Sequence, residues 1–380
     1  MLHVVPTYFP AARYGGPIHS VHGLCKALVR AGHRVDVCTT SVDGAKRLDV
    51  PEGQAVDVDG VCVRYFRSRF DRLYWSPAMS GFLRKNMAGY DAVHLHSVFL
   101  WPTASAAFWA RRRRIPYVLS PRGMLVPELI AARSGLVKRA WIQLIERGNL
   151  SSAARIHVTS TQEGDDLSRC ALALAPVLDL PNGVDLPDTF QRSVIPGQIL
   201  FLGRLSWKKN LEALIDALAR LPSASLILAG PDDEQLAAGL MDRAGASGCA
   251  ARIKLLGTVD AQQKHALFSQ SACTVLPSLN ENFGNVVVEA LAHGCPVVVS
   301  PGVGARGIVS ASGGGVVAAS ADAEALRAAI AQLLDHPERS AQRGEAGASY
   351  VRQHLSWDSV AVKMADAYRQ MAVQCELAGR

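Results

Sequence analysis

Residues 199–218 read ILFLGRLSWKKNLEALIDAL. The first four residues are apolar, as in a buried strand, and the run from Leu211 to Leu218 has helical spacing. A loop that contains Arg204 and Lys209 joins the two. The stretch therefore predicts one strand-loop-helix unit of a parallel sheet, with both cations at the carboxyl end of the strand, where open α/β sheets bind ligands. Two cations beside the start of a helix form an anion site suited to a diphosphate.

A second strand-to-helix stretch lies downstream, where residues 277–291 read PSLNENFGNVVVEAL. Glu281 lies in its loop, and Glu289 lies about a turn and a half into the helix, where it can accept hydrogen bonds from hydroxyls near the helix start. Gly284 allows the backbone to approach a ligand closely. The residues whose backbone N–H groups can receive phosphate oxygens are Asn282, Phe283 and Asn285. A nucleotide sugar offers both phosphates and hydroxyls, so this stretch predicts a site for one.

A purely structural interpretation of the two glutamates is also available. Glu281 can cap the helix, and Glu289 can be an exposed surface carboxylate. For an isolated glutamate pair this interpretation would be favoured. The helix around Glu289 is nearly all apolar, however, and burial of an unpaired carboxylate is costly. The presence of both motifs in one half of the chain favours the functional interpretation.

The bulk composition predicts two globular domains. The chain has 380 residues, of which 49% are hydrophobic and 19% are charged, which excludes an intrinsically disordered protein and suits two domains of ordinary size. The eight cysteines stand singly, without a Cys-x-x-Cys pair or clustered Cys/His spacing, so we expect reduced thiols. The start of the sequence has no basic leader or long apolar segment, and we expect a cytoplasmic protein.

Short apolar runs alternate with amphipathic segments along the whole chain, which predicts parallel sheets covered by helices. We expect a domain over residues 1–182 and a second over residues 190–356. The turn-rich segment 181–188, PNGVDLPD, is predicted to be the hinge. Residues 357–380 are predicted to form a helix that packs back on the first domain. The strand candidates are residues 2–5, 34–39, 92–95, 117–120, 156–159, 199–202, 225–229, 253–256, 274–276 and 296–300.

The excess of positive over negative charge lies in the first half of the chain. The net charge is +7, and residues 1–190 contain 23 lysines and arginines against 16 acidic residues. A basic domain suits an anionic membrane surface, a phosphorylated acceptor or nucleic acid, and a solvated surface with some extra arginines is an equal alternative.

Taken together, these motifs resemble the retaining glycosyltransferases of family four, which have the GT-B fold. The elements that carry the resemblance are the two glutamates eight residues apart, the Gly-Arg-Leu-x-x-Lys-Lys segment 203–209, the Gly15-Gly16 turn after the first strand, and the segment 181–185, PNGVD. The resemblance covers nearly the whole chain. It implies two Rossmann-like, doubly wound domains that face a central cleft, with the donor bound by the C-terminal domain and the acceptor by the N-terminal domain.

The resemblance also implies roles for individual residues. Arg204 and Lys209 would neutralise the diphosphate of the donor. Glu281 would contact the transferred sugar, and Glu289 would bind the ribose. The remaining implied contacts are Gly15 and Gly16 over the phosphates, and Thr258 and Val259 beside the base. No metal ion or cofactor is expected, because the cations and the helix start can take the place of a metal.

The chain departs from the family pattern after the strand 117–120. Many relatives have a histidine near the reacting sugar there, whereas this chain has Arg122. An arginine does not act as a base at ordinary pH, but it can bind the acceptor or a phosphate. His96, at the end of the strand candidate before it, is as consistent with an acceptor contact as with a structural role.

Three other signals are discounted. Asp57 and Asp59 have the spacing of a metal-dependent nucleotide-sugar site, but the stretch 56–65 alternates as a hairpin does. The arginines 111–114 end a helical segment, which favours capping over nucleic-acid binding. No G-x-G-x-x-G follows the first strand, which weakens a dinucleotide dehydrogenase interpretation.

The expected protein is a metal-independent, retaining hexosyltransferase. By resemblance, we expect it to move a hexose from a nucleotide-diphosphate sugar to a saccharide or polyprenyl-linked acceptor in bacterial surface polysaccharide biosynthesis. It would lie on the inner face of the cytoplasmic membrane as a peripheral protein and would not bind nucleic acid. The alternatives are a nucleotide-sugar epimerase or hydrolase on the same fold, and a non-catalytic scaffold subunit.

Overall fold

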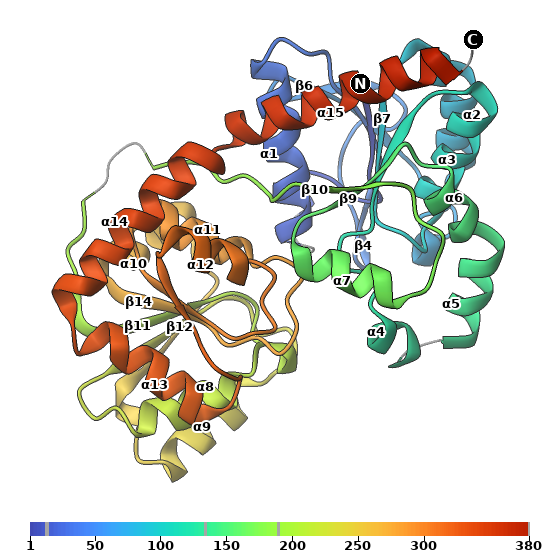
Figure 1. The fold of residues 1–380 in the computed structure, drawn as a ribbon. Coiled ribbons are helices and arrows are strands. Elements are labelled where there is room, and N and C mark those ends of the chain that lie inside the picture. The colour runs from blue at the N-terminus through green and yellow to red at the C-terminus, as the bar shows by residue number, and fades with distance from the viewer. Residues whose placement is uncertain (12–14, 133–134, 188–190, 379–380) are drawn as a thin grey trace. The chain divides into compact units, whose positions relative to one another are not determined.

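The computed structural model describes residues 1–11, 15–132, 135–187 and 191–378. The chain divides into two compact units. Unit 1 comprises Met1–Gly183 and Trp357–Arg380, and unit 2 comprises Val184–Ser356. Each unit contains its own sheet with helices against it (Figure 1). The expected α/β class with two doubly wound units is confirmed.

Unit 1 is built on an eight-stranded sheet in the order β10-β9-β8-β7-β1-β2-β6-β5. Neighbouring strands are parallel except β5 and β6, which form an antiparallel hairpin. The strands are β1 (Leu2–Val4), β2 (Asp36–Thr40), β5 (Ala55–Val58), β6 (Val61–Phe66), β7 (Val93–His96), β8 (Tyr117–Ser120), β9 (Arg155–Val158) and β10 (Val177–Asp179), with a separate ribbon of β3 (Val42–Asp43) and β4 (Lys46–Arg47).

Helices cover the sheet of unit 1 over two hydrophobic cores. Its α-helices are α1 (Gly16–Arg30), α2 (Pro77–Asn86), α3 (Trp101–Arg113), α4 (Pro127–Ala132), α5 (Gly135–Trp141), α6 (Arg147–Ser151), α7 (Thr161–Arg169) and α15 (Trp357–Ala378), and a π-helical turn, Ile142–Glu146, joins α5 to α6.

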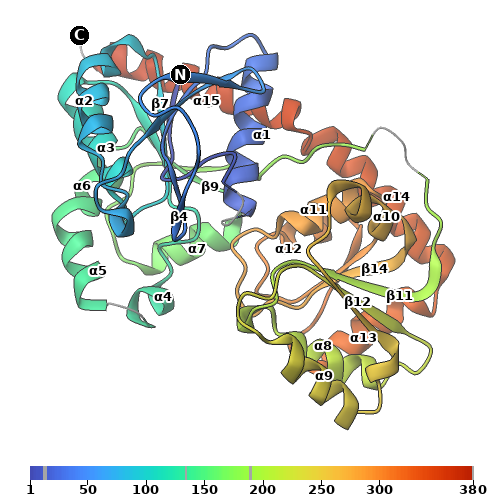
Figure 2. The same cartoon turned by 180° about the vertical axis from the view of Figure 1, so that it is seen from behind.

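The last helix of the chain, α15, packs against the first helix, α1, as both views show (Figures 1 and 2). The ring of Trp357, at the start of α15, explains why two neighbouring positions are glycine. A Cβ atom on Gly23 would lie 2.2 Å from its ring, and one on Gly183 would lie 2.5 Å from it. Only glycine fits at these two positions, because real Cβ contacts are not that short. Glycines in α1 and in the segment 181–183 therefore leave the space that the start of the C-terminal helix needs in order to pack on unit 1.

Unit 2 is built on a six-stranded, fully parallel sheet in the order β13-β12-β11-β14-β15-β16. Helices α8, α9 and α13 lie on one face, and α10, α11 and α12 lie on the other (Figures 1 and 2). The strands are β11 (Ile195–Leu202), β12 (Ser225–Ala229), β13 (Ile253–Gly257), β14 (Ser271–Leu276), β15 (Val297–Val299) and β16 (Gly315–Val317). The helices are α8 (Leu211–Ala219), α9 (Ala237–Ala246), α10 (Ala261–Gln270), α11 (Asn285–Ala292), α12 (Arg306–Ser312), α13 (Ala323–Leu334) and α14 (Pro337–His354).

All ten strand candidates coincide with observed strands, although the ends shift by up to four residues. The hairpin over residues 56–65 is also observed, as β5 and β6. Four strands were not predicted, and two of them, the ribbon strands β3 and β4, have only two residues each. Both β10 and β16 have only three residues, and partners on one side alone hold them at the edges of their sheets. Such short edge strands carry too few residues to show a periodic pattern.

Candidate functional site

The two motifs of unit 2 meet at the switch point of its sheet. In sequence order the six strands are arranged 3-2-1-4-5-6, so β11 is the first strand and β14, its neighbour, is the fourth. The chain leaves β11 toward one flank and leaves β14 toward the other. Ligands of open α/β sheets bind beside the carboxyl ends of the strands at such a point. The loop after β11 and the loop after β14 occupy this position.

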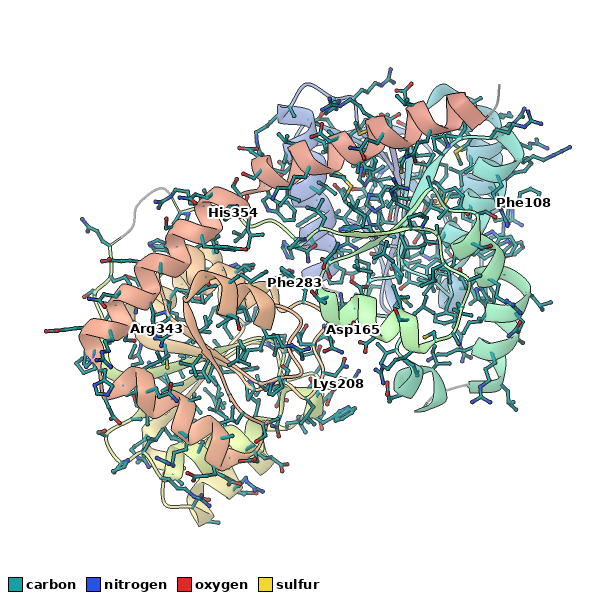
Figure 3. All side chains as sticks on the ribbon, in the orientation of Figure 1. Phe108, Asp165, Lys208, Phe283, Arg343 and His354 are labelled. Atoms are coloured by element: carbon teal, nitrogen blue, oxygen red, sulfur yellow. The ribbon has the colours of Figure 1, made fainter. Side chains whose placement is uncertain are left out.

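Hydrogen bonds join these two loops directly. The backbone N–H of Leu279 donates to the carbonyl of Lys208 at 2.9 Å. The side-chain amide of Asn210 donates to the carbonyl of Pro277 at 3.2 Å and to that of Ala321 at 2.7 Å. The two motifs, more than 60 residues apart in sequence, therefore form one structural feature. Figure 3 shows Lys208 and Phe283, one from each loop, at the same edge of the unit.

Lys209 and Glu281 form an ion pair across the two loops. Both side chains are mostly buried, with exposed fractions of 18% and 25%. Partial burial strengthens such a pair relative to an exposed one. The pair sets a cation, which suits a phosphate, beside a carboxylate, which suits a sugar hydroxyl.

Gly284 opens helix α11 without a side-chain cap. Its φ of 92° lies in the left-handed region, and a Cβ atom there would lie 3.0 Å from Leu276 Cδ2 and 3.2 Å from Val303 Cγ1. Glycine is needed for both reasons. Since no side chain closes the helix start, its positive end faces the loop that carries Glu281, as the sequence predicted.

The loop before α11 is held in place by the segment that follows β15. The backbone N–H of Glu281 donates to the carbonyl of Gly302, and the N–H of Gly304 donates to the carbonyl of Glu281, both at 2.9 Å. A Cβ atom on Gly302 would lie 2.1 Å from the carbonyl oxygen of Leu279. This segment was not predicted from the sequence, although its two glycines right after a strand were a signal of close backbone approach.

Glu289 is paired rather than isolated. It lies on the fifth residue of α11, is about three-quarters buried, and accepts from the Lys264 ammonium of α10 at 3.1 Å. An unpaired carboxylate here would be costly, and the Lys264 ammonium is the partner that removes this cost. The partial burial of Glu289 excludes the fully exposed alternative. The capping alternative for Glu281 is not observed, because α11 has no side-chain cap.

Arg204 lies at the carboxyl end of β11 and forms an ion pair with Asp233 at 3.1 Å. Asp233 belongs to the loop after β12, and the N–H of Leu205 donates to the carbonyl of Pro231 in the same loop. About half of each charged side chain is exposed, so a ligand can reach the guanidinium. Asp233 was not singled out from sequence, because no periodicity marks a loop carboxylate.

Thr258 and Val259 follow β13, on the same edge of the sheet. The carbonyl of Gly257 accepts from the N–H of Gly230 at 2.7 Å, which ties this loop to the one after β12. Helix α10 begins directly afterwards with a capping box made by Asp260 and Gln263. The capping box fixes the point at which the helix starts, so Thr258 and Val259 are held at the carboxyl edge.

In unit 1 the structure brings Arg122 and His96 together. The guanidinium of Arg122 donates to His96 Nδ1 at 3.2 Å and to the side-chain oxygen of Asn182 at 3.0 Å. Arg122 follows β8 and has a φ of 57°, and none of the ion pairs among the described residues includes it. Burial lowers the pKa of Arg122, and the nearby Glu163 carboxylate opposes that shift. Both of these hydrogen-bond partners of the guanidinium are neutral, which makes Arg122 a candidate to receive an anionic ligand group.

His96 cannot act as a base while Arg122 donates to its Nδ1. Its other nitrogen, Nε2, then carries the proton and donates to His3 Nδ1 at 3.0 Å. Burial and the neighbouring guanidinium hold the pKa of His96 well below its usual range. His96 is therefore a neutral link between Arg122 and the core of the sheet.

A second directed chain of hydrogen bonds crosses the same sheet. Its direction is set at the carbonyl of Leu180, which can only accept, so His157 Nε2 carries a proton. Ser120 then donates to His157 Nδ1 at 2.8 Å, and His94 Nε2 donates to Ser120 at 2.7 Å. The chain begins at Tyr368 of α15, whose hydroxyl donates to His94 Nδ1 at 2.6 Å. Both histidines are thereby neutral.

His3, His94 and His96 are close enough for their ring nitrogens to surround a metal ion. Hydrogen bonds to other side chains already engage His94 through both nitrogens and His96 through both nitrogens. The Arg122 cation also donates to His96 of this cluster, and its positive charge opposes the binding of a metal cation there. These residues do not fit a metal site, and the absence of a metal requirement stays a prediction.

The discounted signals have structural explanations. Asp59 accepts from His22 at 2.9 Å and lies 3.6 Å from the Lys26 ammonium, and Asp57 accepts from the N–H of Gly60 in the hairpin turn. The arginines 111–113 form the last turn of α3. Gly15 and Gly16 lie at the start of α1 in unit 1, so their predicted contact with the donor phosphates stays a prediction.

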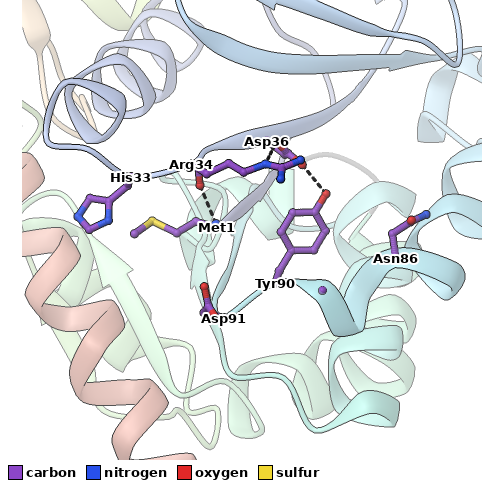
Figure 4. A pocket seen from close by; sticks show the side chains of 8 residues that line it. Met1, His33, Arg34, Asp36, Asn86, Tyr90 and Asp91 are labelled. Carbon is purple, nitrogen blue, oxygen red and sulfur yellow. Dashed lines mark hydrogen bonds and ion pairs between the residues drawn. The ribbon is translucent and has the colours of Figure 1, made fainter.

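One pocket of unit 1, about 310 Å³ in volume, lies at the opposite end of the sheet (Figure 4). It adjoins the starts of β1 and β2, and hydrogen bonds engage several of its polar groups. The Met1 ammonium donates to the Arg34 carbonyl at 2.8 Å, and the Tyr90 hydroxyl donates to Asp36 at 2.7 Å. Strand amino ends are not the usual ligand edge of such sheets, and we assign the pocket no role.

The fold and the site define a class, the two-domain glycosyltransferases of the GT-B type. Residues 15–183 match the family model of the glycosyl transferase 4-like domain, and residues 190–350 match that of glycosyl transferases group 1. The two matches together cover nearly the whole chain. The chain therefore belongs to the glycosyltransferases that combine these two domains, and it is an enzyme of that class.

Known proteins of this class are similar along most of the chain. Glycogen synthase of Mycobacterium tuberculosis is 28% identical over 95% of this chain and 92% of its own. The GDP-mannose:cellobiosyl-diphosphopolyprenol alpha-mannosyltransferase of Xanthomonas campestris is 29% identical over 59% of this chain and 58% of its own. The structure of sucrose-phosphate synthase from Thermosynechococcus elongatus superposes with a TM-score of 0.77 at 23% identity, covering 98% of this chain and 99% of that one.

Within the described ranges, no helix combines the length and the apolar character that a crossing of the bilayer requires.

Proposed function

We propose that this protein is a retaining, metal-independent hexosyltransferase. It moves a hexose from a nucleotide-diphosphate sugar to a saccharide or polyprenyl-linked saccharide in bacterial surface polysaccharide biosynthesis. The observation that supports this proposal most is the ion pair of Lys209 and Glu281 at the switch point, next to the uncapped start of α11. A diphosphate and a sugar hydroxyl are the two ligand groups that this arrangement suits.

The donor pyrophosphate is proposed to bind at the start of α11. When the sugar leaves, negative charge develops on the β-phosphate, and positive groups fixed in place stabilise that charge without reorganisation. Lys209, Arg204 and the helix start would supply them. Glu281 would bind a hydroxyl of the transferred hexose, and Glu289 would bind the ribose. Thr258 and Val259 would lie beside the base. The phosphate would displace Glu281 from Lys209 in part, which frees the carboxylate for the sugar.

Retention of the anomeric configuration is proposed to proceed by front-face attack. The two glutamates of the site are each held by a lysine, so neither is proposed as a covalent nucleophile. The leaving phosphate would instead accept the proton of the acceptor hydroxyl. Trapping of a covalent glycosyl-enzyme, or proton NMR of the product that shows inversion, would contradict this mechanism.

The acceptor is proposed to bind unit 1 through Arg122, with His96 as its neutral support. The name of the Xanthomonas relative gives it a diphosphopolyprenol acceptor, and an arginine that donates to the neutral side chains of Asn182 and His96 suits a phosphate-bearing acceptor of that kind. We propose that the enzyme works on the inner face of the cytoplasmic membrane, where such acceptors are held.

Two alternatives remain as outcomes of a product assay. An epimerase or hydrolase would consume the donor when no acceptor is present. A scaffold subunit would not consume the donor at all. Chromatography of the nucleotide products with and without a membrane lipid extract distinguishes the three. The proposal requires release of nucleoside diphosphate that rises strongly when the extract is added.

The first experiment is a binding panel by calorimetry. UDP-, GDP-, ADP- and dTDP-sugars are titrated into the wild type in EDTA and then into Arg204→Ala and Glu289→Ala. Lys208→Ala is the matched control, because Lys208 adjoins Lys209 but its ammonium lies over the Trp207 ring, 5.7 Å from its centroid. We expect one sugar nucleotide to bind without metal and to lose at least tenfold in affinity in both site variants, since hydrogen bonds to charged groups contribute about 1.5–3 kcal/mol. Equal binding to all four proteins would show that the site assignment is wrong.

A further inference from the structure

Two leucines on the surface of unit 1 are almost fully exposed. Leu136 on α5 has an exposed fraction of 83%, and Leu144, in the π-helical turn that follows, has one of 84%. Val137 beside Leu136 is 69% exposed. Single exposed aliphatic side chains are ordinary on protein surfaces, but several on one short helix form an apolar patch that calls for an explanation.

The π-helical turn places the two leucines on the same face. In a regular α-helix, residues eight positions apart differ by about 80° around the axis. The turn Ile142–Glu146 takes up one extra residue, so Leu136 and Leu144 relate nearly as residues seven positions apart and lie close to one line. The side chains of Ile142 and Glu146 are buried on the opposite face. We call the patch of Leu136, Val137 and Leu144 the leucine face.

Basic side chains accompany the leucine face. Arg139 and Arg147 on the same helical segment are exposed. The helical segment 135–151 contains three basic residues, Lys138, Arg139 and Arg147, and one acidic residue, Glu146, and the short helix α4 before it contains Glu128. Glu146 is buried, where it accepts from the N–H of Phe99 and from the Trp141 indole, each at 2.8 Å. Glu128 pairs with Arg169. The exposed charged side chains of the helical segment that carries the leucine face are therefore positive.

We propose that the leucine face docks unit 1 on an anionic bilayer surface. The leucines and Val137 would enter the interface between headgroups and acyl chains, and Arg139 and Arg147 would bind lipid phosphates. Two contributions hold a protein on a membrane surface, the burial of apolar side chains and the attraction of basic side chains to anionic lipids. A basic helical segment with exposed apolar residues supplies both. A stable protein interface buries roughly 800 Å² on each partner, which three aliphatic side chains do not supply. Figure 1 shows α5 at the periphery of unit 1.

This inference extends the proposed lipid-linked acceptor, but the docking itself needs neither donor nor acceptor. It is therefore tested separately. The full-length protein is sedimented with vesicles of phosphatidylcholine alone and with vesicles that contain 30% phosphatidylglycerol, both without any sugar nucleotide. We expect binding to the anionic vesicles and weak binding to the neutral ones. The double variant Leu136→Asp/Leu144→Asp should reduce the partition coefficient by about tenfold or more.

Matched variants separate the contribution of the basic side chains to membrane binding from that of the apolar side chains. Arg139→Gln/Arg147→Gln should weaken binding to the anionic vesicles several-fold, since each basic residue near such a surface contributes about 1 kcal/mol. Arg339→Gln/Arg352→Gln changes the net charge equally at exposed arginines of α14 in unit 2 and should bind as the wild type does. Val362→Asp on α15, at an exposed valine, controls for the new acidic group.

Three results would overturn the proposal. The first is no binding of the wild type to the anionic vesicles. The second is binding of the leucine variant that equals that of the wild type. The third is a dimer of the wild type in light scattering that the leucine variant loses, because the face would then join two copies of the chain. Equal circular dichroism spectra and melting temperatures exclude misfolding as the cause. Donor binding should be unchanged in every variant, so failure here leaves the proposed function standing.

Discussion

The Lys209 ammonium and the Glu281 carboxylate form an ion pair that joins two loops of unit 2, although the residues are 72 positions apart in sequence. The pair exists because β11 and β14 are neighbours in the sheet. It places a cation and a carboxylate within reach of the uncapped start of α11.

Replacement of Lys209 by alanine should remove a cation that stabilises the leaving phosphate. We expect Lys209→Ala to lower kcat/KM about 100-fold or more, because loss of one fixed donor to a developing anion commonly costs that much. Steady-state kinetics with the donor identified by calorimetry measure the effect. Lys208→Ala should stay within about threefold of the wild type. A Lys209→Ala enzyme with wild-type kcat would exclude Lys209 from the charge-stabilising role.

Glu289→Gln should weaken the donor complex. The substitution keeps the shape of the side chain but removes the charge that would accept hydrogen bonds from the ribose. We expect the KM for the donor to rise about tenfold, with a smaller change in kcat. Glu345→Gln, at an exposed glutamate of α14, is the control. If kcat fell and KM stayed constant, Glu289 would act on the reaction rather than on ribose binding.

Gly284→Ala should destabilise unit 2 and disturb the anion site together. The positive φ of 92° and the contacts at 3.0 and 3.2 Å both oppose a methyl group. We expect a loss of about 1–2 kcal/mol in the free energy of unfolding, measured in urea, and weaker donor binding. Gly239→Ala, in α9 with open space around it, should instead stabilise by about 0.5–1 kcal/mol. Equal stability of both variants would contradict the assigned strain.

Arg122→Lys tests the acceptor side in unit 1. Lysine keeps the charge but does not reproduce the two-armed contact with Asn182 and His96. We expect the KM for the acceptor to rise about tenfold, while the dissociation constant of the donor stays within about twofold. The comparison of acceptor kinetics with donor calorimetry checks this. An unchanged acceptor KM would exclude Arg122 from acceptor binding.

The buried histidines of unit 1 should make the protein sensitive to mild acid. Burial lowers the pKa of His3 and of His157 to about 3, while in the unfolded chain histidine titrates near 6.5. Between these values the unfolded chain binds more protons than the folded one, so stability falls as the pH drops from about 6.5 toward 3. Urea midpoints from pH 7.5 to 4.5 measure the slope.

His157→Gln should flatten that slope. Removal of one buried histidine removes up to one proton from the difference between the folded and unfolded states, which corresponds to about a tenfold change in the unfolding constant per pH unit. His336→Gln, at an exposed histidine of unit 2, should leave the slope unchanged. A wild-type stability that stays constant over this range would show that the histidines are already protonated in the fold.

Much of the local structure of this protein is determined by the sequence alone. An observed strand coincides with each of the ten strand candidates, because each apolar run is long enough to be buried in a parallel sheet. Gly284 before the valine-rich helix indicated where α11 begins, since its conformation is a local requirement. The Asp57–Asp59 stretch likewise predicted its hairpin from alternation. The resemblance to family four then gave the class, which the family models confirm.

The tertiary structure decided which side chains meet. Strand order placed the loops after β11 and β14 side by side, and it selected Lys264 for Glu289 and Asp233 for Arg204. It also joined Arg122 to His96 and linked the histidines of β1, β7 and β9 in hydrogen-bond chains, one of which runs from Tyr368 of α15 to the carbonyl of Leu180. No periodic pattern records such pairs, because they depend on which strands lie next to each other, and the chain settles that order only when the sheets close around their cores.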